Sequence, residues 1–194
     1  MKTLARADLL PLEDYAKQRA DFRARVIEHK RNRKVMLADH ISLQFEDRLT
    51  MQYQVQEMLR VERIFEEGGI EDELAAYNPL IPDGGNLKAT LMVEYEDEAE
   101  RKVALSKLVG IEKSVWIRVK DFDRIRPIAD EDMERQTQDK TSAVHFLRFE
   151  FTPPMIAAAK SGAPISIGVE HSEFRDSLDP LPETVRVALV ADFD

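Results

Sequence analysis

The chain contains no cysteine. This absence excludes disulfide bonds, thiol catalysis, zinc–thiolate sites and cysteine-ligated iron–sulfur clusters. A metal cofactor would therefore have to be held by histidine and carboxylate side chains. The sequence does not identify a particular cofactor.

Long apolar runs are also absent. No run approaches the roughly 18 residues that a membrane-spanning helix needs. The apolar part of residues 1–15 is too short, and the segment too acidic, for a secretory signal peptide. We therefore predict a cytoplasmic protein without a membrane segment.

The familiar catalytic motifs are missing as well. The sequence contains no dinucleotide-binding glycine fingerprint, no P-loop, no G-x-S-x-G nucleophile elbow and no H-E-x-x-H zinc motif. The DGGN segment at residues 83–86 indicates a turn. It is not a phosphate loop, because neither a lysine nor a helix follows it at the required spacing. The sequence therefore leaves open whether the protein is an enzyme.

Acidic residues outnumber basic residues, 37 to 28, so the formal net charge is −9. Such a balance disfavours general binding to nucleic acid. The exception is the strip Lys17–Lys34, which holds eight basic residues against Asp21 and Glu28. We interpret the strip as the basic end of a helix that pairs with acidic neighbours. A phosphate-binding strip is the alternative, although Phe22 is its only aromatic residue for stacking.

What is present is typical of a globular protein. The 194 residues fit one domain, with 43% hydrophobic and 34% charged residues. Within the single domain 1–194 we expect a helical portion over 1–75, a sheet portion over 87–170, and a C-terminal tail with a helix over 171–194.

The helical portion is expected to contain one short hairpin. Apolar spacing indicates two helices within 6–33, broken near Arg19–Asp21. Alternation indicates a hairpin near 35–45. Residues 46–67 contain no glycine or proline, and this length favours one helix over a strand.

The helix expected over 46–67 can be capped by Asp47 at its start and ended by Gly68-Gly69. Its apolar stripe is wide for a lone surface helix. Part of the stripe is expected to form a homodimer contact, unless it packs wholly inside one subunit. The stripe consists of Met51, Val55, Met58, Val61 and Phe65.

The sheet portion, 87–170, follows the order strand–helix–strand, connector, strand–helix–strand. That is the order of a ferredoxin-like split-βαβ sheet. Strands 87–95 and 142–151 carry apolar residues on both faces, so they are expected to be central. The predicted fold class is α+β, with a helical N-terminal third followed by a mixed sheet.

One face of this predicted sheet is polar. Alternation along the two central strands places Lys88, Arg148 and Glu150 on it. If helix 46–67 covers this face, its polar side chains meet Lys88 and Arg148 in a cleft suited to a small anionic or zwitterionic ligand. The alternative is a satisfied ion-pair network between sheet and helix or between subunits. The ligand-binding candidates are Gln52, Gln56, Glu57, Lys88, Arg148 and Glu150.

Two histidines share the parity of apolar strand positions. His145 alternates with Leu147 and Phe149, and His171 continues the alternation of strand 164–169. If the two strands are close, both imidazoles and Glu170 are candidate metal ligands. The alternative is a hydrogen-bonded core histidine at 145 and a solvent-exposed one at 171.

Three long segments carry a resemblance to a known family. They read EDRLTMQYQVQEMLRVERIFE, YNPLIPDGGNLKATLMVEYED and EDMERQTQDKTSAVHFLRFEFTP. They resemble signature blocks of an uncharacterised bacterial family, domain of unknown function 3501, and the resemblance spans nearly the whole chain. It supplies no activity, ligand or catalytic residue that could be transferred.

The resemblance implies a setting instead. Genes of this family often lie near genes for rubrerythrin-like and iron–sulfur proteins, which implies a redox or metal-stress context and a redox protein partner. We therefore expect a non-catalytic accessory or small-ligand-binding protein of a bacterial redox or metal-stress system. The alternative function is a non-haem metal-dependent enzyme that uses histidine and carboxylate ligands.

Overall fold

The computed structural model describes residues 2–131, 135 and 140–194. The N-terminal half begins with helices and one hairpin. Its elements are η1 (Arg6–Asp8), α1 (Leu12–Arg31), β1 (Lys34–Leu37), β2 (Ile41–Glu46), α2 (Arg48–Glu62), α3 (Glu67–Tyr77) and η2 (Asn78–Leu80).

The remainder is richer in strands. Its elements are β3 (Asn86–Val93), α4 (Glu98–Lys107), α5 (Ile111–Ser114), β4 (Val115–Val119), β5 (Ile128–Ala129), β6 (Val144–Glu150), α6 (Pro153–Lys160), β7 (Ile165–Glu170), β8 (Arg175–Leu178) and α7 (Glu183–Val190). Within this described part of the chain, no helix combines the length and apolar character needed to cross a bilayer.

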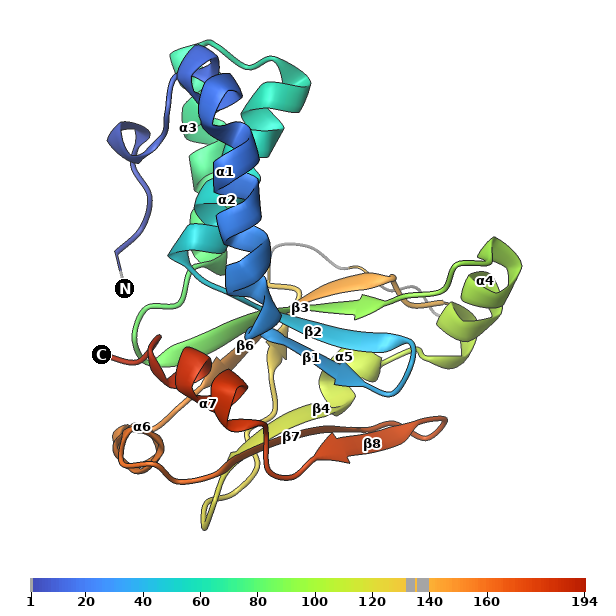
Figure 1. Ribbon diagram of the computed structural model, residues 1–194. Helices are drawn as coiled ribbons and strands as arrows, with labels where there is room; N and C mark the ends of the chain where they lie inside the picture. Colours follow the sequence, from blue (N-terminus) through green and yellow to red (C-terminus); the bar gives the residue numbers. More distant parts are fainter. Residues whose placement is uncertain (1, 132–134, 136–139) are drawn as a thin grey trace.

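The strands form two antiparallel sheets. One has the order β1-β2-β3-β6-β5 and the other the order β4-β7-β8. Figure 1 shows α1, α2 and α3 standing on one side of the larger sheet, with the smaller sheet on the other side. The α+β class and the helical N-terminal portion are therefore confirmed.

The single split-βαβ sheet predicted over 87–170 is wrong. Strands β3 and β6 pair with each other in the larger sheet, and β4 and β7 pair with each other in the smaller one. The two sheets bury a shared apolar core between them. A second sheet packed on the apolar face of the first removes that face from water. Additional strands at the edge of the first sheet would leave the face exposed.

Alternation along β3 divides the larger sheet into two faces. Leu87, Ala89, Leu91 and Val93 point into the shared core. The residues between them are only partly buried and face the helices. The helix-facing side of the sheet is therefore free to carry polar groups.

The helical portion differs from prediction at two points. Helix α1 is continuous through Arg19, because its buried residues Tyr15, Phe22 and Val26 form one stripe across the predicted break. Helix α2 ends at Glu62, where Arg63 adopts a left-handed conformation with φ of 56° and its N–H bonds to the Leu59 carbonyl.

The two glycines expected to end that helix lie inside α3 instead. Asp47 does cap α2, since its carboxylate accepts a hydrogen bond from the Thr50 N–H at 2.9 Å. In the apolar stripe, Met51 and Val55 are buried against α3, whereas Val61 and Phe65 are 62% and 67% exposed.

A buried guanidinium joins the helical portion to the sheets. Arg33 follows α1 and is 2% exposed. It donates to the carbonyl oxygens of Phe45, Glu46 and Ala188 at 2.9 to 3.2 Å. It also forms an ion pair with buried Asp192 beyond α7. One side chain thus fixes the end of β2 against the C-terminal helix.

We predict that Arg33→Met lowers the free energy of unfolding by about 3–5 kcal/mol, because it leaves the Asp192 carboxylate buried without its cation. Arg31→Met is the matched control, since Arg31 pairs with Glu28 at the surface. Urea unfolding of the two variants measures the difference. Equal and small losses in both would contradict the role given to Arg33.

Candidate functional site

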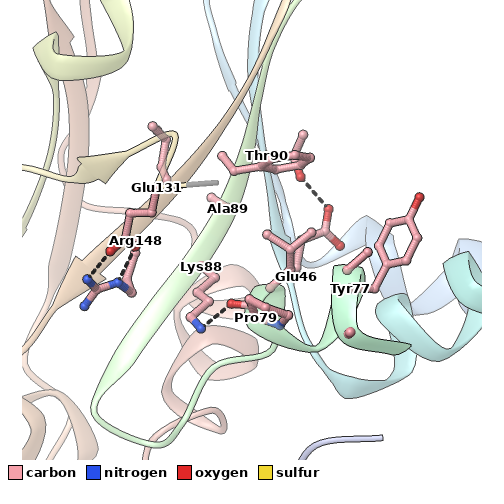
Figure 2. Close-up of a pocket in the computed structure, with 13 residues that line it drawn as sticks. Glu46, Tyr77, Pro79, Lys88, Ala89, Thr90, Glu131 and Arg148 are labelled. Carbon is pink, nitrogen blue, oxygen red and sulfur yellow. Dashed lines mark hydrogen bonds and ion pairs between the residues drawn. The ribbon is translucent and has the colours of Figure 1, made fainter. Parts of the chain in front are cut away.

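A pocket lies between the helix-facing side of the larger sheet and the segment α3–η2. Its volume is about 390 Å³. Figure 2 shows side chains from both walls converging on it. The sheet contributes Glu46, Lys88, Ala89, Thr90, Phe146, Leu147 and Arg148, the connection after β5 contributes Glu131, and α3–η2 contributes Ala75, Ala76, Tyr77, Pro79 and Leu80.

Strand register sets the charged floor of the pocket. Glu46 is the cross-strand neighbour of Lys88, and Lys88 is the neighbour of Arg148. These three residues form a row across β2, β3 and β6. Thr90 and Phe146 form the next pair on the same face. Two-residue alternation therefore delivers both charge signs to one surface.

Arg148 is paired with carboxylates at the rim of the pocket. Its guanidinium forms two hydrogen bonds to the Glu131 carboxylate, at 2.6 and 2.7 Å, and also contacts Glu150. The bonds to Glu131 raise the pKa of Arg148 above its ordinary value, and the same bonds lower the pKa of Glu131. Both partners of this bidentate pair line the pocket.

Lys88 links the sheet to η2 on the other side of the pocket. Its ammonium donates to the Pro79 carbonyl oxygen of η2. Burial lowers the pKa of Lys88, because the charged form loses water. The ammonium has two further N–H donors for a ligand acceptor.

Glu46 is the deepest charged group in the pocket. It is 5% exposed, and its Oε1 accepts a hydrogen bond from the Thr90 hydroxyl at 2.9 Å. Its Oε2 is buried, and no group among the described residues donates to it. Figure 2 shows the carboxylate between Thr90 and Tyr77. A buried acceptor without a donor calls for a partner.

The structure brings together some of the predicted ligand candidates. Lys88 and Arg148 line the pocket. Glu150 lies beside Arg148 and accepts from the Asn86 amide at 3.2 Å. The expected cover, helix 46–67, is replaced by α3 and η2.

Gln52 and Gln56 bind the N-terminal segment rather than the sheet. The Gln52 amide donates to the Asp8 carbonyl at 2.6 Å. The Gln56 side chain accepts from the Leu10 N–H at 2.6 Å and donates to the Leu10 carbonyl at 3.3 Å. The pair therefore fastens the segment before α1 to α2, and the expected meeting with Lys88 and Arg148 does not occur.

Glu57 binds α1. It accepts a hydrogen bond from the Tyr15 hydroxyl at 2.6 Å and two from the Arg19 guanidinium at 2.7 and 2.9 Å. Arg60 contacts it at 3.2 Å. The bonds from Arg19, followed by those from Tyr15 and Arg60, outweigh burial and lower the pKa of Glu57 to about 2.

Three side chains of the basic strip Lys17–Lys34 are engaged within the protein. Arg33 is buried, Arg19 pairs with Glu57, and Lys34 pairs with Glu94 at 3.2 Å. This arrangement agrees with the interpretation of the strip as a helix end paired with acidic neighbours.

His145 is buried on β6 with both ring nitrogens engaged. Nδ1 lies 2.5 Å from the Asp130 carboxylate, and Nε2 lies 2.8 Å from the Thr141 hydroxyl. One imidazole thus holds residues on both sides of the connection between β5 and β6.

His171 and Glu170 are engaged elsewhere. His171 Nε2 lies 2.9 Å from the Val109 carbonyl, and its Nδ1 accepts from the Glu173 N–H at 3.2 Å. Glu170 pairs with Arg124 and Arg126 at 2.6 and 3.1 Å. Among the residues that the structure describes, no three histidine or carboxylate side chains are grouped as a metal site.

Sequence reasoning missed Glu46 and the wall formed by α3 and η2. The helix predicted over 46–67 includes Glu46. In the structure Glu46 is the last residue of β2, and it continues the strand alternation on the same face as Gln44. That alternation is the signal that could have placed it beside Lys88. No comparable local signal identifies Tyr77 or Leu80 as pocket residues.

We predict that Glu57→Gln removes part of the acid sensitivity of the protein. Because the folded-state pKa lies near 2 and the ordinary value is 4.5, the carboxylate stabilises the fold above pH 4.5 and loses this effect as pH falls toward 2. The difference in unfolding free energy between the wild type and the variant should therefore shrink by about 1 kcal/mol over that window.

Urea unfolding at a series of pH values measures this difference. Glu13→Gln, at an exposed position of α1, is the control and should show a constant difference. A constant difference for Glu57→Gln as well would contradict the assigned ion pair.

Comparison with solved structures gives a close structural relative. A crystal structure described as a novel protein of unknown function from Burkholderia pseudomallei K96243 is 52% identical, with a TM-score of 0.95 and full coverage of both chains. No curated protein matches the chain. The family model described as Protein of unknown function (DUF3501) matches residues 3–193. The chain therefore belongs to the DUF3501 family.

Proposed function

We propose that this protein is a non-catalytic small-ligand-binding protein whose binding site is the pocket between the larger sheet and α3–η2. The observation that carries the proposal is the pocket itself. It combines a volume of about 390 Å³ with apolar walls and a few charged groups. Small-molecule sites have this composition.

The lining favours a compact ligand with polar ends. Ala76, Leu80 and Phe146 offer an apolar surface for its body. Glu46 and Lys88 offer opposite charges at two places on the floor. A ligand with one charged end and an apolar body would use the apolar surface and one of the two charges. A zwitterion with an apolar body would use the apolar surface and both charges.

The lining favours binding over catalysis. The lining within the described part of the chain contains no histidine, serine or cysteine. Its one hydroxyl on the floor, that of Thr90, is hydrogen-bonded to Glu46. Covalent catalysis usually needs a nucleophile, a neighbouring base that activates it and a third group that orients the base. These lining residues do not provide that arrangement.

The proposal includes an accessory role in a bacterial redox or metal-stress system, which the family resemblance supports. The homodimer and the redox protein partner belong to the same proposal. Val61, near the end of α2, and Phe65, between α2 and α3, are exposed and offer apolar surface for such a contact.

The metal-dependent enzyme has weaker support. His145 and His171 already use both ring nitrogens within the protein. Elemental analysis of natively purified protein tests this alternative. About one metal ion per chain, lost on His145→Ala in a variant that still folds, would favour it over the ligand-binding proposal.

We predict that filling the pocket abolishes ligand retention. Ala76 is exposed and lines the pocket on α3, so Ala76→Trp places an indole in the binding space without disturbing the core. Purified protein is incubated with a small-molecule extract of bacterial cells, desalted and denatured, and the released compounds are identified by mass spectrometry. The wild type should release about one molecule per chain, and Ala76→Trp at least tenfold less.

Ala20→Trp is the control, since Ala20 is exposed on α1 away from the pocket. It should retain the ligand as the wild type does. Thermal unfolding of both variants checks that they fold. Absence of any retained molecule in the wild type, or equal retention in folded Ala76→Trp, would contradict the proposal.

A further inference from the structure

Glu46 lines the pocket, and its carboxylate has one oxygen that no described residue uses as an acceptor. Its Oε2 is buried and receives no hydrogen bond from the described residues, whereas Oε1 receives one from Thr90. A carboxylate has acceptor capacity at both oxygens. A ligand that donates to Oε2 therefore recovers a hydrogen bond that the protein alone does not make.

The protein cations near Glu46 are directed elsewhere. Lys88 is its cross-strand neighbour, yet the Lys88 ammonium turns to the Pro79 carbonyl. Arg148, next in the row, is held by Glu131. Among the described residues, no ion pair joins Glu46 to either cation. A positively charged donor on the ligand is the group that best complements this carboxylate, because charge-assisted hydrogen bonds are the stronger ones.

Lys88 offers the opposite charge next to Glu46 in the same row, with its ammonium turned toward Pro79. One of its three N–H donors is used on Pro79, and the others are available for an acceptor. The carboxylates of Asp83, Glu131 and Glu150 act on this ammonium electrostatically, but none of the described carboxylates forms a direct ion pair with it. A ligand carboxylate would supply that direct contact. The divergence of the Glu46 and Lys88 side chains separates the two ends of the site (Figure 2).

We infer that the ligand is a small zwitterion whose ammonium group binds Glu46 and whose carboxylate binds Lys88, with an apolar chain between them against Leu80 and Phe146. This inference rests on the proposed function and specifies its ligand class. Glu46 is the residue that discriminates in favour of an amine, and Thr90 positions its carboxylate.

A matched series of compounds tests the ligand class. The six-carbon set is 6-aminohexanoate, hexylamine, hexanoate and hexan-1-ol, and the four-carbon set with 4-aminobutanoate varies the charge separation. Calorimetric titration measures each Kd. In at least one set the wild type should bind the zwitterion most tightly and the amine next, with the anion and the alcohol at least tenfold weaker than the zwitterion.

Two variants assign the ends of the site. Glu46→Gln should weaken binding of the zwitterion and the amine at least tenfold and leave the alcohol unchanged. Lys88→Met should reduce the zwitterion to the level of the amine and leave the amine unchanged. Glu94→Gln, at an exposed position beyond β3 that does not line this pocket, is the control and should match the wild type.

The outcomes separate this inference from the proposed function. A preference for the anion, or no effect of Glu46→Gln in a folded variant, overturns the zwitterion assignment. Failure of every compound to bind overturns it as well. The proposed function survives either result if the wild type, but not Ala76→Trp, retains a molecule from the cell extract. If Glu46→Gln does not fold, the order of affinities in the wild type still decides.

Discussion

The buried Arg33 guanidinium is the constraint on which the arrangement of the molecule depends. It satisfies the carbonyl groups of Phe45 and Glu46 at the end of β2, and it reaches Ala188 and Asp192 at the C-terminal helix. A chain that turns from strand to helix at this point leaves backbone acceptors without partners, and burying them unpaired would be costly. Arg33 removes that cost with one side chain.

The position of the pocket follows from this junction. Fixing the Glu46 carbonyl fixes the place where β2 ends and α2 begins, so the Glu46 side chain stays on the helix-facing side of the sheet beside Lys88. The core on the opposite face fills with apolar side chains of both sheets. The polar side is left for α3 and η2, which cover it incompletely and leave the pocket between them and the sheet.

Local patterns predicted the parts of this arrangement that depend on neighbouring residues. Alternation placed Lys88 and Arg148 on one face, and Asp47 was identified as a helix cap. The pairing of β4 with β7 depends on residues far apart in the chain, so no local pattern separates two sheets from one. The end of α2 also carries no local signal. Arg63 ends the helix in a left-handed conformation, a role that is usually filled by glycine.

The most direct test of the account is a crystal structure of the protein after incubation with a bacterial small-molecule extract. The account predicts one ordered non-protein molecule between the larger sheet and α3–η2, with a donor group within hydrogen-bond distance of Glu46 Oε2. Ordered water alone in that space, with the retained molecule bound elsewhere on the protein, would contradict it.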